Sequence, residues 1–141
     1  MNSSNTNSGG WTSCAMRSTH LPAILALMPT EVQNGIREVN KLTSAGSQSA
    51  TINTTADKLF LLSEIEIFGS VSYSKSGEGT QYDYYKAGNS KVKNRNGSAD
   101  AWWERSPYGS NSARFCRVSS SGDASYSYAS LAFGVAFGFC F

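Results

Sequence analysis

The side chains that most often carry out catalysis are few in this chain and poorly spaced for it. His20 is the only histidine, which argues against a multi-histidine metal site, and no Gly-x-Ser-x-Gly turn presents a serine nucleophile. No glycine-rich loop of the phosphate-binding kind is present. Asp57, Glu64 and Glu66 could together bind Ca²⁺ or act as acid and base, but Glu66 also has the spacing of a helix-capping residue. We therefore expect a non-enzymatic protein with no catalytic residue, metal site or cofactor.

The three cysteines, Cys14, Cys116 and Cys140, fit neither a zinc-binding spacing nor an evenly paired disulfide framework. Cys116 and Cys140 could meet across neighbouring strands. The simpler interpretation is that all three thiols are small buried hydrophobic groups.

The last third of the chain has an unusual composition. Residues 106–141 contain no Lys, Glu, Gln, Met or Trp, although these five types make up about one residue in five before that point. Roughly seven would be expected by that proportion. The missing five are the amino acids that a codon with free first and second bases and a pyrimidine third base cannot encode. Randomising the adenines of asparagine codons produces that codon set, so residues 106–141 are a candidate variable region.

The residue types that remain are those of an antibody paratope. Tyr gives a large amphipathic contact with few rotors to freeze, and Ser, Gly and Asn give adaptable hydrogen bonds. The alternative is a Ser/Gly-rich hairpin that is simply soluble. On the first interpretation, eight side chains contact a ligand: Tyr108, Asn111, Arg114, Arg117, Asp123, Tyr126, Tyr128 and Phe133.

The first half of the chain predicts short helices. Residues 21–28 have helical spacing, with Pro22 in the first turn and Pro29 as the stop. Thr30 and Gln33 have capping-box spacing for a second helix, whose buried stripe would include Val39. Residues 44–55 are expected to be a loop or weak hairpin, and residues 58–62 a buried strand.

A capping box is also predicted at Ser63 and Glu66, for a short helix over residues 64–68 that Gly69 closes. Residues 72–80 are expected to be a loop, and residues 81–87 a helical turn. The basic cluster at residues 91–95 is interpreted as a solvated loop.

The C-terminal third predicts antiparallel strands over residues 101–106, 113–119 and 125–129, with a turn at Ser121-Gly122. Residues 134–141 alternate strictly, which predicts a further strand with one face in the core and small residues packed tightly on the other. Helices followed by antiparallel strands define an α+β fold. The length suggests one domain over residues 1–141, with residues 1–10 as a flexible start.

The segment Trp102-Trp103-Glu104-Arg105-Ser106-Pro107, followed by Phe115-Cys116, Val118, Gly122 and residues 134–139, resembles a signature of a domain of unknown function common in gut bacterial and phage proteins. Gly10-Trp11, Met16-Arg17, residues 59–64 and residues 87–90 resemble the same family. That family is similar to the variable proteins of diversity-generating retroelements and to formylglycine-generating enzymes, which share a C-type-lectin-like fold.

The resemblance implies a rigid scaffold from which the variable side chains point outward. The scaffold would consist of Trp102, Trp103, Phe115, Val118, Val135, Phe137 and Phe139. The family normally has an upstream strand segment, so the chain is expected to be part of a longer protein or to be completed by another chain. The oxidase branch needs a reactive cysteine pair, for which Cys116 and Cys140 are the only candidates, and the matching residues do not place them in such a groove.

Bulk properties narrow the function further. A net charge of +2 and the lack of a dense basic run argue against nucleic-acid binding, and neither a signal peptide nor a membrane-length apolar run is present. The expected function is a ligand-binding adhesin or receptor-binding module on a phage tail or bacterial surface, with a protein or glycan ligand and with a homo-oligomer as one possible assembly. The alternatives are an invariant structural module of the same fold and a formylglycine-generating-type oxidase.

Overall fold

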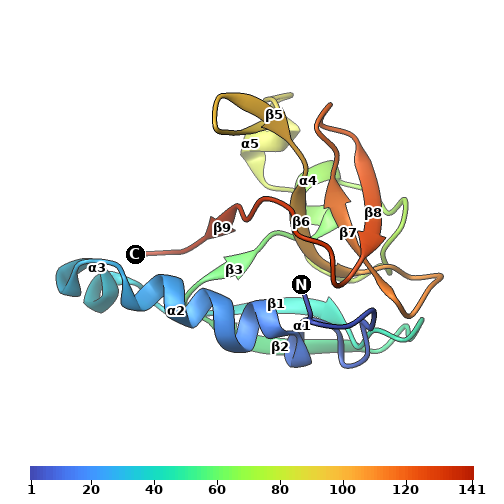
Figure 1. Ribbon diagram of the computed structural model, residues 1–141, viewed down its shortest axis with the longest axis horizontal. Coiled ribbons are helices and arrows are strands. Elements are labelled where there is room, and N and C mark those ends of the chain that lie inside the picture. Colours follow the sequence, from blue (N-terminus) through green and yellow to red (C-terminus); the bar gives the residue numbers. More distant parts are fainter.

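Short helices and short antiparallel strands make up the fold of a computed structural model that describes residues 1–141 (Figure 1). The helical segments are α1 Gly10–Ser13, the π-helix η1 Met16–His20, α2 Leu21–Ala26, α3 Thr30–Gly35, α4 Glu64–Phe68 and α5 Asp83–Lys86. The strands are β1 Val39–Ser44, β2 Ile52–Asp57, β3 Phe60–Leu61, β4 Lys93–Arg95, β5 Ser98–Asp100, β6 Trp102–Pro107, β7 Arg114–Val118, β8 Ala124–Tyr128 and β9 Phe137–Gly138.

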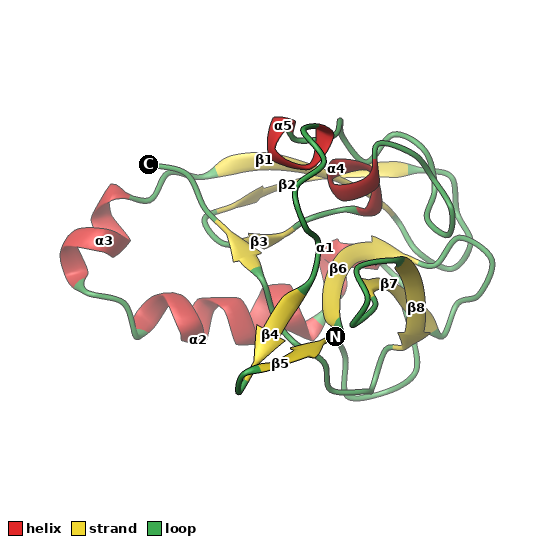
Figure 2. Ribbon diagram, turned by 90° about the horizontal axis from the view of Figure 1, so that it is seen from above, coloured by secondary structure: helices red, strands yellow, loops and turns green.

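All the sheets are antiparallel and small. β1 pairs with β2, β3 with β9 and β4 with β5, while β6, β7 and β8 form a three-stranded sheet in that order. Helix α3 and the three-stranded sheet lie at opposite ends of the molecule (Figure 2). This mixed architecture confirms the α+β class, although α4 and α5 lie between β3 and β4 rather than before all the strands. None of the helices has the length and hydrophobicity that a membrane crossing requires.

The N-terminal helices form where the sequence predicts them, but the capping box predicted at Thr30 and Gln33 is wrong. Pro22 lies in the first turn of α2, as expected. The N-cap of α3 is Pro29, no side chain caps the helix, and the Gln33 side-chain amide donates instead to the Met28 carbonyl at 2.7 Å. Pro29 displaces Thr30 from the cap because its extended backbone supplies the non-helical entry to the helix. Val39 begins β1 rather than extending a helical stripe.

The capping box at α4 is confirmed in full. The Ser63 hydroxyl accepts from the Glu66 backbone N–H at 3.2 Å, and the Glu66 carboxylate accepts from the Ser63 N–H at 3.0 Å. Gly69 ends the helix with φ of 75°, a left-handed conformation that glycine adopts without a Cβ clash. The hairpin alternative for residues 44–55 is also confirmed, as the connection between β1 and β2.

Two segments differ from the prediction. In the basic cluster predicted as a loop over residues 91–95, Lys93–Arg95 form β4 of the β4–β5 hairpin, with Asn96 and Gly97 after it both at positive φ. Residues 134–141 do not form one long strand: β9 pairs with the two-residue β3, and Gly134 and Cys140 form only isolated bridges, with Trp102 and Arg37. Because no strand continues alongside β9, the predicted core-facing side chains Val135 and Phe139 are exposed.

Gly134 and Gly138 nevertheless pack as tightly as the alternation predicts. A Cβ on Gly134 would lie 3.0 Å from the Ala101 carbonyl oxygen, and one on Gly138 would lie 2.8 Å from the Phe60 ring. The C-terminal segment therefore crosses from β6 to β3, and glycine is needed at both contacts.

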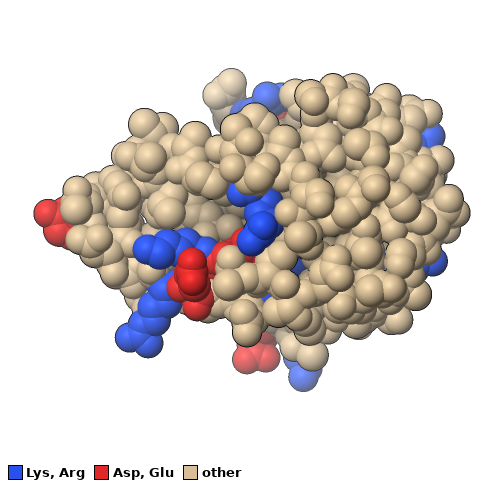
Figure 3. Space-filling model, turned by 90° about the horizontal axis from the view of Figure 1, so that it is seen from below, with Lys and Arg blue, Asp and Glu red and all other residues tan.

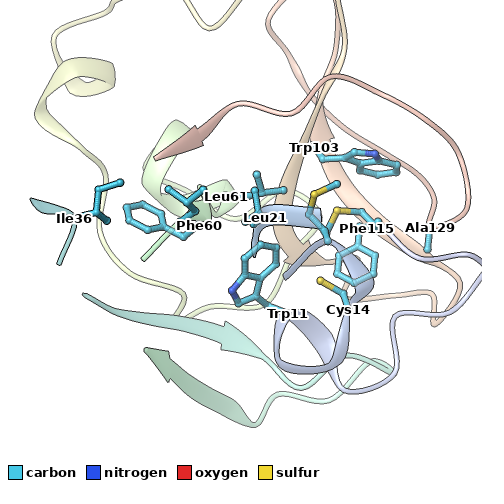
Figure 4. Packing of buried hydrophobic residues seen from close by; sticks show 12 residues of the cluster. Trp11, Cys14, Leu21, Ile36, Phe60, Leu61, Trp103, Phe115 and Ala129 are labelled. Atoms are coloured by element: carbon cyan, nitrogen blue, oxygen red, sulfur yellow. The ribbon is translucent and has the colours of Figure 1, made fainter. Parts of the chain in front are cut away.

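The hydrophobic core has two parts. The larger one runs from Ile36 and Phe60 near the helical end to Trp103 and Ala129 near the three-stranded sheet (Figure 4). The smaller one combines Ile67, Tyr85, Trp102 and Val118. The adjacent residues Trp102 and Trp103 thus pack in different clusters, because successive side chains of a strand point to opposite faces. Strand β6 therefore lies between the two clusters.

Candidate functional site

None of the eight predicted ligand-contacting side chains is buried. They do not form one patch, however. Tyr108, Arg114, Tyr126 and Tyr128 lie together, while Asn111 belongs to the β6–β7 loop and Asp123 to the β7–β8 turn. Arg117 and Phe133 lie apart from these four: strand register pairs Arg117 with Trp103, and its guanidinium lies 4.6 Å from the Phe133 ring centre.

The first group, completed by Tyr73, is called here the tyrosine–arginine cluster and consists of Tyr73, Tyr108, Arg114, Tyr126 and Tyr128. The Tyr108 and Tyr126 rings are stacked with centroids 4.3 Å apart and planes 7° apart. Tyr73 meets both edge-on, at 5.9 Å from Tyr108 and 4.9 Å from Tyr126. Edge-to-face and stacked contacts each add stability beyond burial, so the three rings hold one another in place.

Arg114 lies over the outer tyrosines of this cluster. Its guanidinium carbon is 4.5 Å from the Tyr128 ring centre and 5.1 Å from that of Tyr126, within cation–π range. One guanidinium nitrogen, Nη2, donates to the Tyr128 hydroxyl at 3.2 Å, and this hydrogen bond raises the pKa of Arg114 above its ordinary value. No carboxylate pairs with Arg114.

Tyr73 was not predicted, and its position depends on buried groups in other elements. The Glu64 carboxylate, fully buried in α4, accepts from the Tyr73 N–H at 3.0 Å and the Ser74 N–H at 2.7 Å. The Tyr73 carbonyl accepts from the Gly109 N–H at 2.7 Å. A Cβ at Gly109 would lie 3.0 Å from the Ser74 carbonyl oxygen, so the 72–80 loop and the β6–β7 loop approach closely at a glycine. No local sequence signal reveals this contact.

The N-terminal segment, expected to be a flexible start, packs against the same loop. The Asn7 side chain is fully buried and donates to the carbonyls of Arg114 at 2.7 Å and Asn111 at 2.9 Å. Its carbonyl oxygen accepts from the Ser47 N–H at 2.8 Å. The Asn111 side chain accepts from the Ala113 N–H at 2.8 Å, so its oxygen already shapes the loop.

Phe133, the aromatic partner of Arg117, borders a different hollow. Phe133 packs on Trp103 with ring centroids 5.0 Å apart and lines an apolar depression of about 580 Å³. The depression lies between η1, α2 and residues 130–135, and His20 is at its edge. The predicted residues therefore serve two surfaces, of which only the tyrosine–arginine cluster combines several of them.

Beneath the cluster, a buried polar network holds β6 in place. Arg105 is fully buried, and its guanidinium donates to Glu66 at 2.5 Å and to the carbonyls of Leu61, Leu42 and Glu78 at 2.9, 3.0 and 3.0 Å. Lys41 donates to the other oxygen of Glu66 at 2.6 Å. Burial alone would raise the pKa of Glu66, but the hydrogen bonds and charges of Arg105 and Lys41 outweigh it and lower the pKa.

Two further carboxyls of this region, those of Glu78 and Glu104, are buried in surroundings that disfavour their charged form. Glu78 accepts hydrogen bonds from the Ser106 hydroxyl and the Ser44 N–H, yet burial raises its pKa. Glu104 is fully buried and neither of its oxygens has a hydrogen-bond partner. Burial, then the nearby Glu64 and Glu78 charges, hold the pKa of Glu104 well above its ordinary value, which favours the protonated acid.

The other candidates for chemistry have structural partners. The Asp57 carboxylate accepts from the Trp11 indole N–H at 3.0 Å and from Arg17 at 2.6 Å. It borders a hollow of about 280 Å³ between α2 and β2, also lined by Arg17, Glu38 and Lys58. On the face that Figure 3 shows, charged side chains of both signs gather around one hollow and most of the remaining surface is uncharged. No group of three or more His, Cys, Asp or Glu side chains is arranged to hold a metal ion.

The three thiols are free, and two of them are buried. Burial raises the pKa of Cys14 to about 11 and holds that of Cys116 well above its ordinary value, which keeps both protonated and weakly nucleophilic at neutral pH. Cys140 is exposed and its backbone forms a bridge with Arg37, so the predicted meeting of Cys116 and Cys140 across neighbouring strands is wrong. Cys116 lies in β7, whose neighbours are β6 and β8, so it does not face the segment that carries Cys140.

Comparisons with known proteins place the chain in one family. Neither the curated proteins nor the solved structures include a match to it. A family model described as "Domain of unknown function (DUF6273)" matches residues 1–140, nearly the whole chain. The chain therefore belongs to the family of domains of unknown function DUF6273.

Proposed function

We propose that this protein is a non-enzymatic ligand-binding module of the C-type-lectin-like kind, whose last third carries a variable binding surface. In this proposal the buried residues of β6 and the two cores are the constant scaffold. The side chains of β7, β8 and the loops at their ends that are not buried bind the ligand. The module would act as an adhesin or receptor-binding domain on a phage tail or a bacterial surface.

The observation that carries the proposal is the contrast in burial within one sheet. Every residue of β6 is buried, whereas β8 has no buried residue and Tyr128 is 44% exposed. Apart from the buried Ser106, residues 106–141, which lack Lys, Glu, Gln, Met and Trp, thus place their Tyr, Ser and Arg side chains where they are partly or fully exposed and substitution disturbs little packing.

The chemistry of the cluster also supports binding over catalysis. Tyrosine rings and an arginine without a carboxylate partner offer contact area, hydrogen-bond donors and charge, and these are typical of protein-binding surfaces. The buried thiols with raised pKa values argue against an oxidase that needs a thiolate.

The test is the pattern of variation in sibling genes and in the DNA beside this gene. The proposal expects substitutions concentrated in the codons for exposed residues of 106–141, and a near-copy of that coding stretch close to a reverse transcriptase gene. Codons for Trp102, Trp103 and Phe115 should stay constant. Substitutions spread evenly over the chain, with Lys and Glu at the Tyr and Ser positions, would favour an invariant structural module instead.

A further inference from the structure

We infer that the tyrosine–arginine cluster is a receptor for a carboxylate on a protein partner, with Arg114 pairing an exposed Asp or Glu side chain. This inference rests on the proposed function, because it names the chemistry of the ligand at the same surface.

Arg114 is a cation without a counterion. The last third of the chain contains three charged residues, Arg114, Arg117 and Asp123. Asp123 follows the end of β7 opposite to Arg114, and its carboxylate accepts from the Ser121 hydroxyl at 2.8 Å. No acidic side chain within residues 106–141 therefore neutralises the charge of Arg114.

The rings around Arg114 hold its guanidinium group in one orientation. Tyr126 and Tyr128 lie against the guanidinium, and Tyr126 is itself held by Tyr73 and Tyr108. Its Nε is covered and donates to no acceptor, and its Nη2 contacts only the Tyr128 hydroxyl. Guanidinium has five N–H donors, of which one is used and the covered Nε–H is closed to a ligand, so the three others on Nη1 and Nη2 remain for an incoming acceptor. Holding the side chain in advance lowers the entropy lost on binding.

The acceptor that fits best is a carboxylate, since the planar donor fork of arginine pairs with both of its oxygens. The hydroxyls of Tyr73, Tyr108 and Tyr126 make no hydrogen bond within the protein and can add donors beside it. The cluster thus offers donors and apolar ring edges but no negative charge.

The shape of the surface favours a protein over a free sugar acid. The hollow at Arg114, Tyr126, Ser127, Tyr128 and Leu131 measures about 180 Å³. Enclosed small-molecule sites are usually larger, roughly 300–1,000 Å³, and bury most of their ligand. A small open hollow among Tyr and Ser side chains suits one projecting acidic side chain whose neighbours lie on the surrounding rings.

The first experiment selects ligands from a random peptide library displayed on phage. The wild-type protein and the variants Arg114→Gln and Arg37→Gln are immobilised separately after a circular dichroism check of folding; Arg37 is an exposed arginine outside the proposed binding surface. The expected result is enrichment of Asp and Glu in peptides that bind wild type and Arg37→Gln, and loss of that enrichment with Arg114→Gln. Peptides without acid enrichment, or equal enrichment on Arg114→Gln, would overturn the inference and leave the proposed function standing. Failure to enrich any peptide would overturn the inference alone, because the proposed function also includes a glycan ligand.

The second experiment identifies the source of the carboxylate. A selected peptide, its Glu→Gln or Asp→Asn analogue and free glucuronate are titrated into ¹⁵N-labelled protein while the arginine Nε–Hε resonances are followed. The peptide should shift the Arg114 resonance, assigned through its loss in Arg114→Gln, and the analogue should bind about 10- to 100-fold more weakly. Equal binding of the analogue, or a tighter response to glucuronate, would overturn a protein carboxylate as the ligand.

Discussion

Strands β6 and β8 belong to the same three-stranded sheet, but the polar side chains of β6 are buried and those of β8 are not. The polar side chains of β6 are buried, and those of Arg105 and Ser106 bind groups from β1, β3, α4 and the 69–82 segment. Those of β8 are half-buried or exposed, and Tyr126 and Tyr128 contact mainly other aromatic and arginine side chains. A change on β6 therefore disturbs several elements at once, whereas a change on β8 disturbs its neighbours alone.

The strongest test of this contrast makes the same substitution at the buried Arg105 of β6 and at Arg117 of β7, which is only half-buried like most of β8. Arg105→Met leaves Glu66 and three backbone carbonyls without their buried donor, so we expect a loss of about 3–5 kcal/mol in the free energy of unfolding. Arg117→Met removes a half-exposed side chain whose one backbone hydrogen bond is long, at 3.4 Å, so we expect a change of about 0.5 kcal/mol.

Urea unfolding followed by tryptophan fluorescence measures both variants. If Arg105→Met does not fold, Arg105→Lys keeps the charge while losing the planar donor fork, and it should still be clearly less stable than Arg117→Met. Equal losses for the two arginines would contradict the contrast between the strands.

The unpartnered Glu104 carboxyl gives a pH-dependent test. A pKa that is higher in the folded than in the unfolded protein means that the folded state binds more protons between the two values, so stability falls as the pH rises above the ordinary value of 4.5. Glu104→Gln removes this loss. We expect the variant to match wild type near pH 4.5 and to be more stable by about 1–3 kcal/mol at pH 8.

Glu66→Gln is the control, because the pKa of Glu66 is shifted in the opposite direction to that of Glu104. The pKa of Glu66 is lowered, so its contribution is present above the ordinary value and lost as the pH falls. This variant should be less stable than wild type at pH 7, with the difference shrinking toward low pH. Urea unfolding at several pH values measures both, and a Glu104→Gln difference that does not grow with pH would show that the carboxyl is not held protonated.

The two predicted capping boxes allow a smaller test. Ser63→Ala removes the acceptor for the Glu66 N–H and the donor to the Glu78 carbonyl at 2.8 Å, so we expect a loss of about 1–2 kcal/mol. Thr30→Ala, at the predicted cap that the structure does not use, should change stability by less than about 0.5 kcal/mol. Thermal unfolding compares the two, and a larger effect at Thr30 would reverse the assignment of the caps.

These two sites show what the sequence could predict and what it could not. The Ser63 cap was predictable because its partner lies three residues away, and β6, β7 and β8 were predictable from local patterns and turns. At α3 the same spacing gave a wrong prediction, because Pro29 occupies the position where the chain enters the helix. The β4–β5 hairpin had a signal in Asn96-Gly97, a sequence that favours tight hairpin turns.

Other features depend on contacts between distant segments. The inclusion of Tyr73 in the candidate site requires the 72–80 loop to meet Gly109, and the exposure of Phe139 follows from the two-residue length of β3. Neither is encoded in local spacing. The grouping of Tyr108 with Arg114, Tyr126 and Tyr128, and their separation from Arg117, likewise follows from the sheet register rather than from composition.

The same substitution at two tyrosines, one on the surface and one in the core, compares scaffold and surface most directly. Tyr128→Ser removes a side chain that is 44% exposed at the end of β8, together with its contact to Arg114, so we expect a loss of about 0.5 kcal/mol. Tyr85→Ser removes a side chain that is 6% exposed in the smaller core and should cost about 3–5 kcal/mol by opening a cavity. Urea unfolding of the pair compares identical chemical changes at the two positions. A loss above about 1.5 kcal/mol for Tyr128→Ser would mean that this tyrosine stabilises the fold, and a surface that supports the fold in this way could not vary freely to accept different partners.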